Sequence, residues 1–220
     1  MKHLLAAFLL ALATTASADT LAFKVVGIDC AGCVPPVMKA LKSVAGVANP
    51  KVDWKSGTAS VDVPAGFDRA KLRTALAANG FDAIFAGEAR SEFAALPPEV
   101  VKSLDIVSST DGRKVDVAKL LAPGKVTIVD WYGEWCGPCK VLESRLQHYM
   151  ASNIASNPGL ALRRVDIGKW DNEAARQATR EFRLSELPYV RIYDRSGKFV
   201  TEVHGAMWDE VLAAIAKASK

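Results

Sequence analysis

The sequence lacks features that would place it in several large functional classes. After residue 18, the chain of 220 residues has no run of about 18 consecutive apolar residues, so we expect no integral membrane architecture. It has no glycine-rich phosphate-binding loop and no nucleophile elbow. The formal net charge is only +4 and is spread along the chain, which gives no support for nucleic-acid binding.

Histidine and cysteine are also scarce. No histidine lies beside a cysteine in the sequence, so we interpret the histidines after residue 18 as structural or solvated. The four cysteines form two Cys-x-x-Cys pairs that lie about 100 residues apart. Because the pairs of a zinc ribbon lie roughly 15–20 residues apart, this spacing disfavours a shared zinc site.

The amino terminus has the pattern of a cleavable signal peptide. Lys2 gives a positive start, Leu4 to Ala13 form an apolar run, and Ala16-Ser17-Ala18 fits the small-x-small cleavage rule. We therefore expect residues 1–18 to direct export to a bacterial periplasm or an equivalent space. Thiols there are exposed to oxidising conditions.

Residues 88–98 lack a clean hydrophobic period and end in Pro97-Pro98, which predicts a linker between two domains. Residues 19–87 alternate between strand-like and helix-like patterns in the order strand, helix, strand, strand, helix, strand. This βαββαβ order predicts a ferredoxin-like fold for the first domain.

Residues 99–220 predict a second domain with a different order of elements. Val126 to Trp131 form an apolar run typical of a strand buried on both faces, and a helix is expected from about Pro138. Another strand is expected at Leu160 to Ile167, and a charged helix and two further strands follow before the last helix. Strands that alternate with helices predict an α/β sandwich.

One cysteine pair lies where a strand ends and a helix begins, in Trp135-Cys136-Gly137-Pro138-Cys139. Free backbone N–H groups and the helix dipole stabilise a thiolate there, so Cys136 should have a lowered pKa and attack disulfides. Cys139, one turn later, can resolve the mixed disulfide. The interpretation depends on a sulfur at Cys136 that ionises readily and that foreign disulfides can reach. A purely structural disulfide is the alternative.

At these residues the chain resembles the thioredoxin family, through Val129 to Lys140 and through Leu187-Pro188. The resemblance covers most of residues 100–220 and implies a thioredoxin fold. It implies that Cys136 is the attacking thiol and Cys139 the resolving thiol.

The resemblance also implies roles for the residues around the two cysteines. Asp130 would be the buried acid that assists deprotonation of the second thiol, and Pro188 would form a cis-proline step that holds a substrate backbone. The alternatives are that Asp130 is an ordinary core acid and that Pro188 is a loop proline. Trp135 serves packing as much as chemistry. We expect Leu162 at the place of the family's buried lysine, and Arg163-Arg164 at a solvated strand end.

The other pair, Cys30 and Cys33, follows the first expected strand. Two thiolates on an exposed loop can bind a soft ion such as Cu(I) and leave it open to a partner's thiols, whereas Zn²⁺ prefers four ligands. This region resembles the heavy-metal-associated domain of copper chaperones and metal-transporting ATPases, through Gly27-x-x-Cys30-x-x-Cys33 and Asn79 to Ala83. Ile28 stands where that family usually has Met.

Two points about this first domain stay open. Phe81 lies either near the metal loop or in the core. Cys30 and Cys33 either bind metal, form a disulfide that is a substrate or relay, or form an inert bridge.

Together these features predict an exported thiol–disulfide oxidoreductase that reduces disulfides connected with the handling of copper or another soft metal. The redox reaction needs no cofactor, while Cu(I) or another soft metal ion would bind at Cys30 and Cys33. Expected partners are a disulfide-bearing protein substrate, a membrane electron donor and a copper-receiving protein. The Gly-Pro dipeptide resembles that of reducing members. The alternative is a Cu(I) carrier or sensor whose thioredoxin fold only docks partners, and a pure interaction scaffold is a third class.

Overall fold

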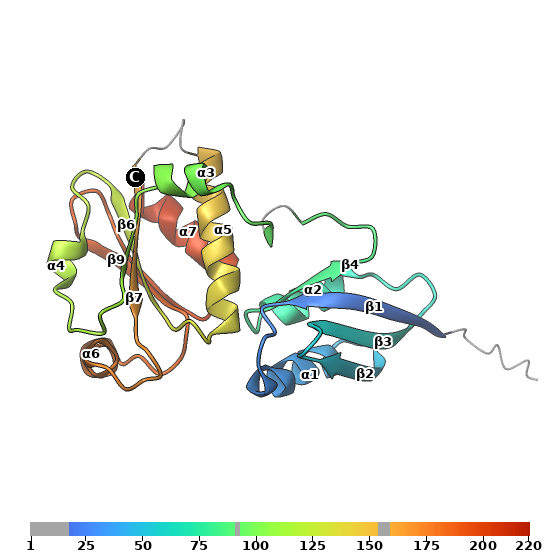
Figure 1. Ribbon diagram of the computed structural model, residues 1–220. Helices are drawn as coiled ribbons and strands as arrows, with labels where there is room; N and C mark the ends of the chain where they lie inside the picture. The colour runs from blue at the N-terminus through green and yellow to red at the C-terminus, as the bar shows by residue number, and fades with distance from the viewer. Residues whose placement is uncertain (1–17, 91–92, 154–158) are drawn as a thin grey trace, which may run out of the picture.

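The computed structural model describes residues 18–90, 93–153 and 159–220. The expected signal peptide lies outside these residues except for Ala18, where the first strand begins. The described chain forms two units, each built on its own sheet (Figure 1). In the described residues, no helix is long and apolar enough to cross a membrane.

The first unit has the expected βαββαβ order and is a ferredoxin-like fold. Its four strands form an antiparallel sheet in the order β2-β3-β1-β4. The strands are β1 (Ala18–Val26), β2 (Ala48–Asp53), β3 (Thr58–Pro64) and β4 (Asp82–Phe85), and the helices are α1 (Val34–Lys42) and α2 (Ala70–Ala77). A short 3₁₀ turn, η1 (Ala31–Cys33), precedes α1.

Alternation along β3 explains how this sheet forms. Its side chains alternate between buried and less buried, so Ala59, Val61 and Val63 point into the core. Leu41 of α1 and Leu72 and Leu76 of α2 are fully buried against them. Burying side chains of this size stabilises a fold by about 1.5–3 kcal/mol each.

The second unit has a mixed five-stranded sheet in the order β5-β7-β6-β8-β9. β5, β7 and β6 are parallel, whereas β8 and β9 are antiparallel to their neighbours. The strands are β5 (Ile106–Ser109), β6 (Val126–Tyr132), β7 (Leu160–Asp166), β8 (Tyr189–Tyr193) and β9 (Phe199–His204). The helices are α3 (Pro98–Ser103), α4 (Val117–Leu120), α5 (Gly137–Asn153), α6 (Glu173–Phe182) and α7 (Trp208–Ala218).

Apolar side chains fill both faces of this sheet, as a sandwich requires. Leu142 and Leu146 of α5 and Ile215 of α7 pack on one face. Ala175 and Ala178 of α6 pack on the other. All residues of β6 are buried, which confirms the expected strand with two covered faces. The unit is therefore the α/β sandwich of a thioredoxin fold.

Three short elements, α3, β5 and α4, were not expected from the sequence. None of the residues of α3 or α4 is buried, and Val107 in the edge strand β5 is 51% exposed, so these segments carry little hydrophobic pattern. The expected linker ends where α3 begins, at Pro98. Residues 91–92 of that linker lie outside the described residues.

Candidate redox and metal-binding sites

Cys136 and Cys139 lie at the amino terminus of α5, directly after β6. They form a disulfide, and the backbone N–H of Cys139 donates to Cys136 Sγ over 3.2 Å. The backbone N–H of Lys140 donates to the carbonyl oxygen of Cys136, so the helix begins at this pair. When the pair is reduced, the helix terminus stabilises a thiolate on Cys136.

The two sulfurs are less accessible than we expected. Cys136 is 4% exposed and Cys139 is 1% exposed, and they pack with Tyr132 and the partly buried Leu187. Next to them Trp135 is 43% exposed, and its indole N–H donates to the carbonyl oxygen of Gly168 over 2.6 Å. Trp135 is thus the exposed side chain next to a nearly buried cysteine pair.

The peptide bond between Leu187 and Pro188 is cis, as the resemblance implied. Pro188 is buried, and its carbonyl oxygen accepts a hydrogen bond from Gly205 N over 2.8 Å. Because Leu187 packs on the cysteine cluster, this turn borders the redox pair.

Asp130 lies in the middle of β6 and is fully buried. Its neighbour in the register of β7 is Arg164, whose Nε lies 3.2 Å from Asp130 Oδ2. The expectation of Leu162 at this place was wrong, because Leu162 pairs with Ile128, two residues earlier. The expectation that Arg164 is a solvated strand end was also wrong, since it is 7% exposed.

The surroundings of Asp130 favour its protonated form. Burial raises the pKa of Asp130 to about 6, the positive charge of Arg164 opposes this rise, and the negative charge of Glu143 adds to it. Glu143 Oε1 lies 2.7 Å from Nη1 of Arg164, whose guanidinium also stacks on the Tyr132 ring at 3.7 Å. The sequence analysis missed Glu143, although it follows Cys139 by four residues and so lies on the same face of the helix.

A cavity of about 350 Å³ lies beside this group. Its walls come from the end of β6, the first turns of α5 and the middle of β7. It is lined by Tyr132, Gly133, Glu134, Cys139, Lys140, Glu143 and Arg164. The resolving cysteine and the Arg164–Glu143 ion pair thus share one solvent-accessible space.

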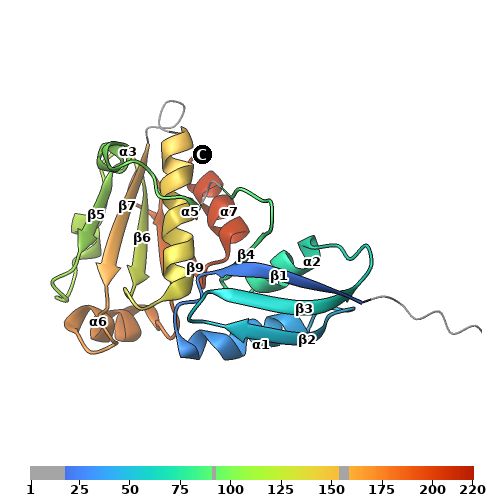
Figure 2. The same ribbon diagram turned by 45° about the vertical axis from the view of Figure 1, so that its right-hand side comes forward.

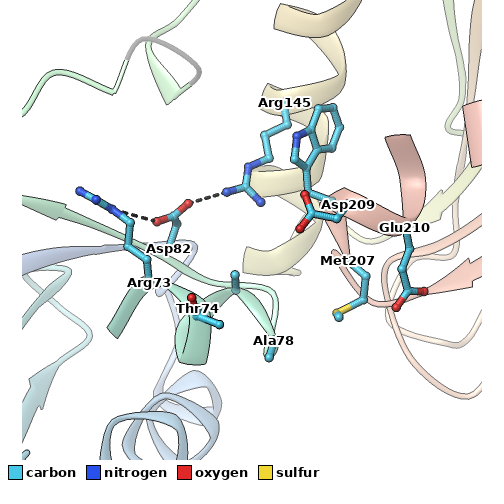
Figure 3. Close-up of a pocket in the computed structure, with 10 residues that line it drawn as sticks. Arg73, Thr74, Ala78, Asp82, Arg145, Met207, Asp209 and Glu210 are labelled. Atoms are coloured by element: carbon cyan, nitrogen blue, oxygen red, sulfur yellow. Dashed lines mark hydrogen bonds and ion pairs between the residues drawn. The ribbon is translucent and has the colours of Figure 1, made fainter. Parts of the chain in front are cut away.

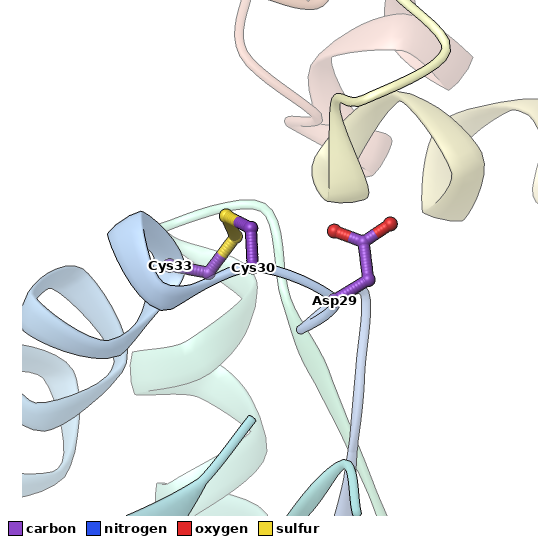
Figure 4. A group of neighbouring side chains, drawn as sticks. All are labelled: Asp29, Cys30 and Cys33. Atoms are coloured by element: carbon purple, nitrogen blue, oxygen red, sulfur yellow. A yellow bond between two sulfur atoms is a disulfide. The ribbon is translucent and has the colours of Figure 1, made fainter. Parts of the chain in front are cut away.

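In the first unit, Cys30 and Cys33 lie between β1 and α1 and also form a disulfide (Figure 4). Cys30 is partly exposed, but Cys33 is only 7% exposed, so the pair is less open than the exposed loop we expected. Asp29, which the sequence analysis missed, is exposed next to them. The possible ligand atoms of the three residues lie within 4.8 Å of one another.

This donor set fits a thiophilic metal ion once the disulfide has been reduced. Two thiolates are soft ligands, and the carboxylate of Asp29 is a third, harder one. In the disulfide form both sulfurs are bonded to each other and cannot serve as thiolate ligands. Ile28 and Phe81 are 6% and 3% exposed, so Phe81 lies in the core and Ile28 fills the apolar underside of the loop.

The two cysteine loops adjoin each other in space. The amino-terminal end of α5 faces the loop that follows β1 (Figure 2). A Cβ atom added to Gly137 would overlap the carbonyl oxygen of Gly27, so only glycine allows this approach. Lys140 Nζ forms an ion pair with Asp29 Oδ2, directly between the two motifs.

Further contacts extend this interface along α5. Asp82 of β4, 2% exposed, forms ion pairs with Arg145 of α5 and with Arg73 (Figure 3). Arg90 Nη2 also lies 3.1 Å from Oδ2 of the same carboxylate. A cavity of about 460 Å³ lies beyond this contact, with Trp208 of α7 in its wall. The two units therefore touch at the redox motif and again at Arg145, farther along α5.

These folds and sites define a class of protein in which a thiol redox centre is joined to a thiol metal-binding loop. Comparison with known families agrees: residues 113–218 match the thioredoxin model, and residues 22–82 match the heavy-metal-associated domain model. Residues 22–82 thus form a heavy-metal-associated domain, and residues 113–218 form a thioredoxin domain.

Similar proteins support the thioredoxin assignment. Chloroplastic thioredoxin F of Oryza sativa subsp. japonica is 31% identical over 91 residues, which are 41% of this chain and 44% of that protein. The thioredoxin of Coprinus comatus is 25% identical over 47% of this chain and 86% of its own length. A thiol:disulfide interchange protein TxlA homolog of Synechocystis is 27% identical over 42% of this chain and 48% of that protein. The chain thus spans less than half of two of these three relatives.

Solved structures resemble each unit separately. Oxidised MerP from Ralstonia metallidurans is 28% identical, with 32% of this chain and 99% of that chain covered and a TM-score of 0.30. The thioredoxin of Malassezia sympodialis is 22% identical, with 54% of this chain and 92% of that chain covered and a TM-score of 0.39. The thioredoxin relatives and the motif at Cys136 and Cys139 support thiol–disulfide oxidoreductase activity.

Proposed function

We propose that this protein is a thiol–disulfide oxidoreductase that acts on protein disulfides, with Cys136 as the attacking residue and Cys139 as the resolving residue. The observation that carries the proposal is the Cys136–Cys139 pair at the start of α5, next to the cis-proline turn at Pro188. Cys139 also shares a cavity with Arg164, the ion-pair partner of buried Asp130. A helix terminus, a buried acid and a backbone-binding turn are what an exchange reaction requires.

The reaction transfers two electrons to the substrate. The Cys136 thiolate attacks one sulfur of a foreign disulfide, forms a mixed disulfide and releases the other sulfur as a thiolate. Cys139 loses its proton and attacks Cys136 Sγ, so the second substrate sulfur leaves and the Cys136–Cys139 disulfide forms. Asp130 takes up the proton of Cys139. Pro188 holds the substrate backbone beside Trp135.

Continued turnover needs a source of electrons for this disulfide. We propose that the chain is exported by its amino-terminal segment to the periplasm and that a membrane electron donor reduces Cys136–Cys139 there. The Gly137-Pro138 dipeptide supports a reducing role, because it resembles that of reducing members. In an oxidising compartment such a protein must be reduced again after each turnover, which is why a donor is needed.

The metal-binding domain gives the exchange reaction its context. We propose that reduced Cys30 and Cys33 carry Cu(I) or another soft metal ion as cargo, and that the thioredoxin domain reduces this pair or the cysteine pairs of a copper-receiving protein. Reduction would then control metal binding, because only thiolates are ligands. The contact between Gly27 and Gly137 supports reduction within the chain, since it holds the two loops together.

Two measurements test this function. The reduced protein should reduce the interchain disulfides of insulin, and Cys136→Ser should abolish this activity. In addition, thiol trapping after export should find Cys30 and Cys33 reduced in the wild-type chain and oxidised in Cys136→Ser. Equal reduction of Cys30 and Cys33 in both chains would reject reduction within the chain, and insulin reduction by Cys136→Ser would reject the oxidoreductase itself.

A metal carrier or sensor is the second candidate function. It is favoured by the low exposure of Cys136 and by the docking of the metal loop on the thioredoxin domain. In that case the thioredoxin fold serves as a docking surface, and the protein binds Cu(I) but reduces insulin no faster than the reductant alone does.

A further inference from the structure

Asp130 has one oxygen that the protein leaves without a partner. Oδ2 contacts Arg164, whereas Oδ1 is the only buried side-chain nitrogen or oxygen atom without a hydrogen-bond partner in the described part of the chain. Such an atom loses the hydrogen bonds that it would make with water, which is unfavourable. A role as a temporary proton acceptor accounts for it, because protonation gives the carboxyl group a donor and removes its charge.

Arg164 connects this buried carboxylate to a second one nearer the surface. Its Nε contacts Asp130, and its Nη1 contacts Glu143, whose side chain is 30% exposed. Arginine stays protonated in proteins, so it cannot carry the proton itself. It can only hold the two carboxylates in a fixed geometry with its rigid fork of donors.

The cavity of about 350 Å³ provides the space between these groups and the solvent. Cys139, Glu143 and Arg164 all line it, so it meets both the source of the proton and the partly exposed carboxylate. Its volume accommodates several water molecules, each of which occupies about 30 Å³ in the liquid.

We propose that Glu143 is the group through which the proton taken from Cys139 leaves the site, and that Arg164 is the positioning residue that holds Asp130 and Glu143 for this transfer. The proposal rests on the thiol–disulfide exchange proposed above. It adds a path by which the proton leaves the site, because Asp130 is fully buried and cannot give the proton directly to bulk water.

Cys139 gives its proton to Asp130 Oδ1, and its sulfur bonds to Cys136 Sγ while the bond between Cys136 and the substrate breaks and the substrate leaves as a thiolate. Asp130 does not itself line the cavity, so it passes the proton through a water molecule that enters from the cavity to Glu143, which releases it to the solvent. One proton leaves the site, Asp130 returns to its ionised form, and no further oxidant or reductant is needed.

The test measures the resolution step alone. Reduced protein is mixed with a disulfide substrate, and release of the second substrate sulfur is followed in single turnovers from about pH 5 to about pH 9. Glu143→Gln keeps the size of the side chain and removes its ability to accept a proton. We expect it to slow resolution about tenfold and to move the acid limb of the pH profile to lower pH, because the negative charge that raises the pKa of Asp130 is gone.

Glu134→Gln is the matched control. Glu134 lines the same cavity and carries the same charge, but no contact joins it to Arg164. We expect its rate to stay within about twofold of the wild type. Glu143→Ala should be slow as well, and added formate, which can enter the cavity, should restore its rate in proportion to concentration.

The outcomes separate this proposal from the proposed function. If Glu143→Gln resolves at the wild-type rate with an unchanged pH profile, or is slowed no more than Glu134→Gln, Glu143 is not the exit. A Glu143→Ala variant that formate does not rescue shows that Glu143 has only a structural role. The proposed function fails on a different result: Cys139→Ser, with Glu143 intact, then forms no mixed disulfide at Cys136.

Discussion

Lys140, the residue after one Cys-x-x-Cys motif, forms an ion pair with Asp29, the residue before the other. The two residues are 111 positions apart in the chain and belong to different domains. Their contact, with the approach of Gly27 to Gly137 beside it, places the metal loop against the helix end that carries the redox pair.

Reversing one charge of this pair should loosen the docking of the two domains. The side chains of Lys140 and Asp29 are 55% and 36% exposed, so their ion pair stabilises the docked arrangement by at most about 1 kcal/mol, about fivefold in the docking equilibrium. We expect Asp29→Lys to shift the amide resonances of residues around Gly137, and Asp29→Lys with Lys140→Asp to shift them back. Identical spectra for the single and double variants would show that the pair does not hold the domains together.

Gly137→Ala should separate the domains more completely. Within α5 alanine is about 1 kcal/mol more favourable than glycine, so the helix itself tolerates the change. The added Cβ, however, would overlap the backbone of Gly27. We expect faster proteolysis in residues 88–98 of the variant than of the wild type, at unchanged helix content. Equal rates of cleavage would contradict the observed contact.

Replacing Asp130 should change how stability depends on pH. Burial raises the pKa of Asp130 in the folded chain from 3.8 to about 6, so its contribution to stability is complete below about pH 4 and is lost as the pH rises through about 6. The loss above that pH amounts to about 3 kcal/mol. We expect Asp130→Asn to unfold at higher urea concentration than the wild type at about pH 8, although it loses the ion pair with Arg164, and the gain should disappear near pH 4.

The control for that measurement is Asp166→Asn, which removes a carboxylate from the partly exposed end of the same sheet. Its stability should follow the wild-type pH dependence. If the difference in stability between the wild type and Asp130→Asn is the same at all these pH values, Asp130 ionises as freely in the fold as in water.

Asp29 should influence which metal ion the reduced first domain prefers. A carboxylate is a hard ligand that suits Zn²⁺ better than Cu(I), and it lies within reach of both sulfurs. We expect Asp29→Asn to weaken Zn²⁺ binding roughly tenfold and to leave Cu(I) binding nearly unchanged, measured by competition with chelators. Lys140→Gln is the matched control, because it breaks the same ion pair and keeps the carboxylate. A parallel loss for both metals would exclude Asp29 as a selective ligand.

Much of the fold was predictable because its strands and helices have strong hydrophobic periods. β3 alternates and β6 is a continuous apolar run, and the structure has strands at both places. The elements that were missed are short and have few buried side chains, so tertiary contacts and not local pattern define them. Edge strand β5 is the clearest case.

The candidate sites were predictable where sequence spacing alone fixes the geometry. Both cysteine pairs lie at helix starts, as expected. The partner of Asp130 was assigned wrongly because β7 is buried on both faces, so its pattern gives no alternation from which to decide between Leu162 and Arg164. The contact between the domains leaves no signal in the sequence except glycine at positions 27 and 137, which many turns also require.

The most direct test of the account is the ionisation of Cys136 itself. In a full-length chain with Cys30→Ser, Cys33→Ser and Cys139→Ser, the rate of alkylation by iodoacetamide is measured against pH. A thiolate stabilised by the start of α5 predicts a midpoint below about 7.5, with reaction at neutral pH despite the low exposure of the residue. A midpoint at or above about 8.5, the value of a free cysteine, together with slow reaction at every pH, would contradict the account.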